Sequence, residues 1–245
     1  MHTVAIGVVG LLVGVLGTGA GGLATLALGR PGEGLLSGVL GFSAGIMLSV
    51  VFLDLIPEAF AAGGLLPTMA GLFLGTIIIM ILDLILPHTH FFSESEEGSQ
   101  YVKTGVVLGL GIAMHNLPEG LAIGSGYAVG VETGLGLAIA IAIQNIPEGM
   151  AMATPMMIGG VDPKKVLIWT GAAGVPMGIG AFLGALIGHV SPLVLAVSLG
   201  FAAGAMLYII FDEMIPDAQQ LAEGHSGTFG GVAGVIVGIL LLAAL

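Results

Sequence analysis

Two short motifs combine imidazole, amide and carboxylate side chains in apolar surroundings. The sequence HNLPEG begins at His115, and the similar sequence QNIPEG begins at Gln144. On a helix, His115 and Glu119 lie four residues apart and therefore on one face, and Gln144 and Glu148 have the same spacing. Mixed nitrogen and oxygen donors suit divalent Zn, Fe, Mn, Co or Cd. The two motifs therefore predict a metal-binding pocket.

Each motif also carries a proline and a glycine beside its glutamate. Pro118 and Pro147 have no amide hydrogen, and their rings clash with the carbonyl groups four residues earlier, so we expect a kink in each helix. Such kinks would turn backbone oxygens toward the pocket. Gly120 and Gly149 would then allow the two helices to approach each other closely.

The composition places these helices in a membrane. Of 245 residues, 56% are hydrophobic, 44 are glycine and only 8% are charged, whereas soluble domains carry about 25% charged residues. This excludes a soluble globular enzyme, and the net charge of -11 excludes a nucleic-acid partner. There is no cysteine, which excludes disulfides and thiolate metal ligands. The fold class that remains is an all-α polytopic membrane protein.

Eight apolar stretches are long enough for membrane helices, which need about 20 residues. We expect them, in a single transmembrane domain over 1–245, at 3–28, 34–62, 64–86, 101–128, 131–158, 163–188, 192–222 and 227–245. All four basic residues fall at connections on one face: Arg30, Lys103, Lys164 and Lys165. The positive-inside rule makes that face cytoplasmic, so the polar loop 88–100 lies inside and both termini lie outside.

Two internal repeats run in opposite directions through this predicted bundle. Residues 41–59 and 200–218 are identical at ten of 19 positions and lie on the second and seventh helices. The HNLPEG and QNIPEG motifs lie on the neighbouring fourth and fifth helices. Helices 1–3 then correspond to helices 6–8, and helix 4 corresponds to helix 5. Inverted repeats are typical of alternating-access transporters, which bind their substrate at the repeat interface.

Glu119 and Glu148 are expected near the centres of their helices, where each charge costs about 2.5–3.5 kcal/mol on insertion scales. No lysine or arginine lies deep in any predicted span. A proton or a metal cation from outside must therefore neutralise these carboxylates. The neighbouring imidazole and amides favour a metal, and a proton relay without metal is the alternative.

HNLPEG followed by NIPEG resembles the ZIP (Zrt/Irt-like) divalent-metal transporters, especially their prokaryotic, GufA-like branch. The resemblance spans nearly the whole chain and implies a 3+2+3 inverted-repeat arrangement, often as a homodimer. It also implies an elevator-like motion of helices 1, 4, 5 and 6 against helices 2, 3, 7 and 8. The primary transport site that it implies consists of Met47, His115, Glu119, Gln144 and Glu148. The metal is then the substrate, and no resident cofactor is expected.

In some family members a second site lies beside the first, at the positions of Asn116 and Asn145, with both glutamates bridging. This chain departs from that pattern. The position of Asn145 is often aspartate, and Val175 stands where some relatives carry a glutamate before the helix-6 proline. Two carboxylates are thus missing, so we expect one well-formed metal position and a second that is weak or empty.

Charged residues and histidines near the helix ends suggest a path to and from the site. By resemblance to relatives, a cytoplasmic exit is expected from Asp83, His88, His90, Asp212 and Glu213. Near the outer end of the second helix, Asp54 and Glu58 could attract cations to an entrance. For both groups, ordinary solvated charges are the alternative interpretation.

The leading hypothesis is transport of a divalent cation, Zn before Fe, Mn, Co or Cd, across the cell membrane into the cytoplasm by alternating access. A metal-selective channel is one alternative, and an intramembrane metalloenzyme is another. The enzyme is disfavoured because the HExxH pair of a zinc protease is absent: position 116 is Asn and position 119 is Glu. We therefore expect a transporter and not an enzyme, with metal ions and the lipid bilayer as its partners.

Overall fold

The computed structural model describes residues 2–29, 31–85 and 97–244. This part of the chain is almost entirely helical and contains no strand. Eight spans within it are long and apolar enough to cross a membrane: Thr3–Leu28, Glu33–Gly63, Leu65–Leu84, Tyr101–Val129, Val131–Ile158, Pro163–Gly188, Pro192–Gln220 and Ser226–Ala244. The all-α polytopic fold with eight spans is confirmed, and the predicted ends are close to the observed ones.

Five spans are single helices, and three are interrupted. The single helices are α1 (Thr3–Leu28), α4 (Leu65–Ile85), α5 (Glu97–Val129), α6 (Val131–Ile158) and α11 (Ser226–Ala244). The second span is divided into α2 (Glu33–Val50), a π-helical turn η1 (Val51–Leu55) and α3 (Ile56–Gly63). The sixth is divided into α7 (Pro163–Ala173) and α8 (Val175–Gly188). The seventh is divided into α9 (Pro192–Ile209), the π-helical turn η2 (Ile210–Met214) and α10 (Ile215–Gln220).

The two π-helical turns stand just before Pro57 and Pro216. The amide of Ile56 bonds to the carbonyl of Val51, five residues back, and Ile215 bonds in the same way to Ile210. A proline supplies no amide, and the wider turn makes room for its ring. In contrast, α5 and α6 remain α-helical across their internal prolines, and the kinks expected there stay predictions.

The inverted repeat is visible in both the order and the packing of the helices. The elements α9, η2 and α10 each begin 159 residues after α2, η1 and α3, respectively. The contacts follow the same correspondence, because α11 packs on α2 as α4 packs on α9, and α1 packs on α6 as α8 packs on α5. The structure thus has the predicted arrangement, in which the first three spans correspond to the last three.

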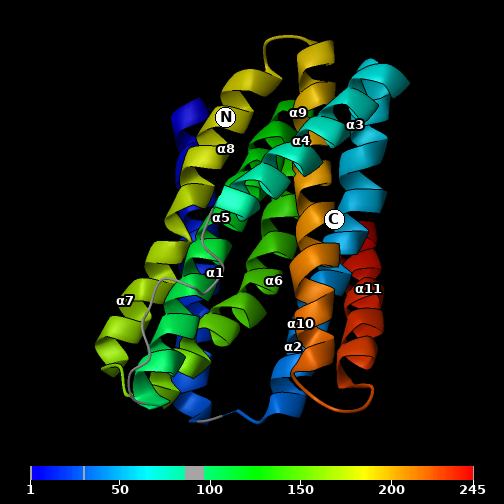
Figure 1. Ribbon diagram of the computed structural model, residues 1–245. Coiled ribbons are helices and arrows are strands. Elements are labelled where there is room, and N and C mark those ends of the chain that lie inside the picture. The colour runs from blue at the N-terminus through cyan, green and yellow to red at the C-terminus, as the bar shows by residue number, and fades with distance from the viewer. Residues whose placement is uncertain (1, 30, 86–96, 245) are drawn as a thin grey trace.

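The helices form two bundles, and both motifs lie in the same one (Figure 1). The motif bundle contains α1, α5, α6, α7 and α8, and the flanking bundle contains α2, α3, α4, α9, α10 and α11. The main contacts between the bundles are those of α2 with α6 and of α5 with α9. This division agrees with the two helix groups that the family resemblance implies.

Glycines let the helices of the motif bundle approach very closely. A methyl group on Gly149 would lie 2.1 Å from the carbonyl oxygen of Thr18 on α1, and one on Gly120 would lie 2.0 Å from that of Met177 on α8. The expectation that these two glycines bring α5 and α6 together is therefore wrong. They face the outer neighbours α1 and α8, because each motif helix turns its polar residues toward the centre and its glycine away from them.

Candidate metal site

The two motif helices bring their polar side chains together at the centre of the molecule. Each of these residues is at most 4% exposed: His115, Asn116 and Glu119 on α5, and Gln144, Asn145 and Glu148 on α6. Burial of this kind is costly for carboxylates and for imidazole unless each polar atom finds a partner. The positions of the hydrogen-bond partners therefore indicate what the pocket can bind.

Each buried carboxylate is held at one oxygen by a neutral donor. Gln144 Nε2 donates to Glu119 Oε1 at 2.5 Å, which links the two motif helices. Ser43 Oγ, on α2 of the flanking bundle, lies 3.2 Å from Glu148 Oε1 and can donate to it. The carboxylates are thus oriented by an amide and a hydroxyl.

Three buried polar atoms have no hydrogen-bond partner within the described part of the chain: His115 Nε2, Gln144 Oε1 and Glu148 Oε2. His115 Nε2 lies 3.2 Å from Glu213 Oε2, which is an ion pair if the imidazole is protonated. An unsatisfied buried polar group costs about 1–3 kcal/mol. One imidazole nitrogen, one amide oxygen and one carboxylate oxygen are a donor set that a divalent cation could satisfy.

A cavity of about 530 Å³ leads to this site from one end of the bundle. His115, Glu148 and Glu213 line it, together with residues from the start of α2, the start of α5 and the ends of α6 and α10. These helix ends lie at the bottom of Figure 1. Lys103 near the start of α5 and the two lysines at the start of α7 belong to the same end. The cavity therefore joins the polar pocket to the lysine-bearing end.

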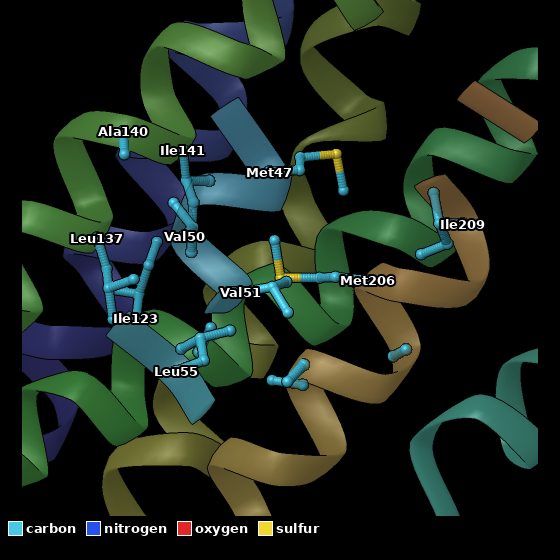
Figure 2. Close-up of a cluster of buried hydrophobic side chains, with 14 of the residues drawn as sticks. Met47, Val50, Val51, Leu55, Ile123, Leu137, Ala140, Ile141, Met206 and Ile209 are labelled. Atoms are coloured by element: carbon cyan, nitrogen blue, oxygen red, sulfur yellow. The ribbon is translucent and has the colours of Figure 1, made fainter. Parts of the chain in front are cut away.

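The opposite half of the bundle interface is closed by a group that we call the seal. Its apolar part is buried between η1, α5 and α6 (Figure 2) and consists of Val51, Leu55, Ile123, Leu137 and Ile141. Its polar part is a buried hydrogen bond of 2.8 Å between Ser125 Oγ on α5 and Ser198 Oγ on α9. The two halves of a symmetrical bundle thus differ, since one half holds a cavity and the other is packed.

Comparison with known proteins agrees with these features. The family model of the ZIP zinc transporters matches residues 88–245. The zinc transporter ZupT of Corynebacterium aurimucosum is 32% identical over 95% of this chain and 94% of its own length. The chain belongs to the ZIP family. The resemblance carried by HNLPEG and NIPEG is thereby confirmed.

Two other relatives match this ZIP chain over shorter segments. ZupT of Corynebacterium glutamicum is 38% identical over 44% of the chain, and ZupT of Shigella flexneri serotype 5b is 36% identical over 46% of it. These matches cover 48% and 43% of the two relatives, so the chain spans about half the length of these curated relatives.

In this ZIP chain, the amides at the predicted second metal position bond to one another and to the backbone. Asn116 Nδ2 donates to the carbonyl oxygens of Ile112 and Ala173 at 3.0 Å each. The Asn145 amide lies between two oxygens, 3.3 Å from Asn116 Oδ1 and 3.2 Å from Glu119 Oε2, and rotation of the amide lets Nδ2 donate to either. Ala173 is the last residue of α7, so Asn116 also satisfies a carbonyl at a helix break.

The described residues of the predicted exit fall into two groups. Glu213 lies beside His115 at the central site, whereas Asp83 and the exposed Asp212 both interact with Tyr208. Asp83 is buried on α4, where its Oδ2 accepts a hydrogen bond of 3.0 Å from the hydroxyl of Tyr208. His88 and His90 lie outside the described residues. Within those residues, no three His, Cys, Asp or Glu side chains are grouped so that they could hold a metal.

The remaining predicted residues lie on α2, η1 and α3. Met47 is fully buried, one turn beyond Ser43, in the apolar core that also contains Met206 (Figure 2). Asp54 and Glu58 are partly buried on the half of the bundle opposite the cavity. Their roles as a ligand and as an entrance stay predictions.

Sequence reasoning missed Ser43, Tyr208 and the Ser125–Ser198 pair. Serine and tyrosine are ordinary in membrane helices, and their partners lie 73 to 125 residues away in the chain. One signal for Ser43 was available in the repeat, because the equivalent position in the second copy is Ala202.

Proposed function

We propose that this ZIP protein transports a divalent metal cation, with Zn²⁺ as its expected substrate, by alternating access through the pocket between α5 and α6. The observation that carries the proposal is a set of buried atoms without a hydrogen-bond partner among the described residues: His115 Nε2, which lies 3.2 Å from Glu213 Oε2, Gln144 Oε1 and Glu148 Oε2. Nitrogen and oxygen donors of this kind bind dications, and the absence of thiolate favours release.

Glu119 completes this site once the cation is present. Its Oε1 now accepts the hydrogen bond from Gln144 Nε2, and a cation would replace that donor. Two ionised carboxylates, Glu119 and Glu148, carry the charge that a single dication neutralises. Neutralisation matters because an uncompensated charge at the centre of a membrane helix costs several kcal/mol.

The pocket is proposed to hold one metal at a time. Asn116 uses its amide hydrogens on two backbone carbonyls, and Asn145 is bonded within the same network. Ligation of a second cation would have to break these bonds without gaining a carboxylate.

The substrate is proposed to leave through the cavity into the cytoplasm. The cavity opens at the end of the bundle that carries the lysines, and the positive-inside rule assigns that end to the cytoplasm. Both termini and the α8–α9 connection then lie outside. Glu213, beside His115, would receive the cation first on its way out, and Asp83 and Asp212, which both interact with Tyr208, would receive it next. His88 and His90 are included as exit residues on the family resemblance alone. Asp54 and Glu58, on the other half, would serve entry.

A carrier is favoured over a channel and over an enzyme. A channel needs a path open at both ends, whereas here the seal closes one half of a symmetrical interface. The inverted repeat provides two equivalent arrangements that can alternate. On the family resemblance, we include a homodimer in the cell membrane in the proposal.

The proposal is tested by metal uptake into proteoliposomes. Zn, Fe, Mn, Co and Cd are offered separately to wild type, to Glu148→Ala, and to Glu132→Ala, whose carboxylate is exposed at the start of the same helix. Wild type and Glu132→Ala should show saturable Zn uptake, and Glu148→Ala should not. Equal uptake by Glu148→Ala, or no uptake of any metal by wild type, would overturn the proposal.

A further inference from the structure

Ser43 lies at the site although it belongs to the other bundle. It is completely buried on α2, and its hydroxyl lies 3.2 Å from Glu148 Oε1 and 3.0 Å from the carbonyl oxygen of Gln144. Both partners belong to α6 of the motif bundle. The contact therefore joins the bundles at the carboxylate that the proposed function uses.

The hydroxyl has two acceptors but only one hydrogen to donate. While the hydrogen points to Glu148 Oε1, this oxygen is fixed, and Oε2 is the oxygen without a partner. When a cation draws on both carboxylate oxygens, the hydroxyl can turn to the Gln144 carbonyl. Glu148 is then released without leaving an unsatisfied donor behind.

The inverted repeat gives a second, independent indication. The position equivalent to Ser43 in the second copy is Ala202, which lies completely buried on α9 and has no hydroxyl. The surrounding residues are largely kept between the copies, including the methionine one turn later, at Met47 and Met206. A hydroxyl at only one of two equivalent positions indicates a local role for Ser43, since helix packing alone would be served equally by alanine.

We propose that Ser43 is a positioning residue, which holds Glu148 by one carboxylate oxygen so that the other faces the incoming cation. This inference rests on the proposed function, since it assigns Ser43 a role at the same site. Partners that orient metal ligands in this way contribute to affinity through the ligand and do not touch the metal.

The test compares Ser43→Ala with Ser43→Thr, which keeps a donor, and with Ser49→Ala. Ser49 lies on the same helix, but its hydroxyl bonds to the carbonyls of Gly45 and Val235, away from the site. Zn²⁺ affinity is measured by titration calorimetry on the purified full chain, and KM and maximal rate are measured in proteoliposomes. Thermal melting reports whether each variant is folded.

Ser43→Ala should weaken Zn²⁺ binding and raise KM by about tenfold, with a melting temperature close to that of Ser49→Ala. Ser43→Thr should recover much of the affinity, and Ser49→Ala should bind as wild type does. A Ser43→Ala variant that melts earlier but binds Zn²⁺ with the wild-type Kd would overturn the inference and leave the proposed function standing. Failure of wild type itself to bind or transport metal would instead remove the proposed function.

Discussion

Ser125 on α5 and Ser198 on α9 share a buried hydrogen bond of 2.8 Å across the two helix bundles. The bond lies on the half of the interface that is packed, and the cavity lies on the other half. By the repeat, Thr154 on α6 is the counterpart of Ser125, and Thr154 lines the cavity. The serine pair therefore marks a contact that must separate if the bundle is to open on the opposite side.

A cysteine at each of these two positions should lock the transporter. The chain has no native cysteine, so oxidation of Ser125→Cys/Ser198→Cys can form only this disulfide within a chain. Oxidised protein should lose Zn²⁺ uptake almost completely and yet bind Zn²⁺, because the cavity stays open at its other end. Reduction should restore uptake.

The two single-cysteine variants serve as controls for this experiment, and both should transport with and without oxidant. Full uptake by the cross-linked protein, with the cross-link verified by mass spectrometry, would show that the bundles do not separate at the seal.

Gly149→Ala should destabilise the fold. The added methyl group would meet the Thr18 carbonyl oxygen at 2.1 Å, so α1 and α6 would have to move apart. Overpacking of this kind costs about 1–3 kcal/mol, which should lower the melting temperature in detergent by several degrees. Gly34→Ala is the matched control, because nothing lies within 4 Å of the added methyl group. Gly34→Ala should be neutral or stabilising, and equal melting of both variants would contradict the close packing of α1 on α6.

Each chain should bind one Zn²⁺ ion. The amides of Asn116 and Asn145 are engaged in hydrogen bonds. The second metal position therefore has few free donor atoms for another cation. Equilibrium dialysis with elemental analysis should give a ratio near one for wild type and near zero for Glu148→Ala. Two tightly bound ions per wild-type chain would show that Asn116 and Asn145 give up their hydrogen bonds to bind a second cation.

Glu213→Gln should slow transport more than it weakens binding. Glu213 Oε2 lies 3.2 Å from His115 Nε2 on the cavity side, where its charge draws the cation away from the pocket. We expect the maximal rate to fall by about tenfold, in the range found for residues around metal sites, with a smaller change in KM. Glu132→Gln, at the exposed start of α6 and away from the cavity, should transport normally. A Glu213→Gln variant with the wild-type rate would remove Glu213 from the path.

Much of the fold was predictable, because membrane helices are encoded by long apolar stretches and by the repeated segments 41–59 and 200–218. The π-helical turns at Val51 and Ile210 were not predicted. From the sequence alone, the prolines beside these turns predict the same local disruption of the helix as Pro118 and Pro147. However, α5 and α6 stay α-helical across Pro118 and Pro147. Packing around each proline, which the local sequence does not specify, decides between these outcomes.

The candidate site was predicted in its motif residues but not in its neighbours. His115, Glu119, Gln144 and Glu148 follow from helical spacing, and the structure places all four together. Ser43 was not predicted, and Glu213 was predicted only as an exit residue. Both reach the site through contacts between bundles, which no spacing along one helix reveals. For the same reason, the glycines of the motifs were assigned to the wrong partner helix.

The most direct test of the metal site is X-ray absorption at the zinc edge on the purified, Zn²⁺-loaded protein. The chain contains six histidines, but a site between α5 and α6 predicts a shell with a single imidazole, oxygen atoms as the other ligands and at most one sulfur, from Met47. The imidazole signal should disappear in His115→Ala, while His189→Ala leaves it unchanged. A shell with two or more imidazoles, or one that His115→Ala does not alter, would contradict a site built from α5 and α6.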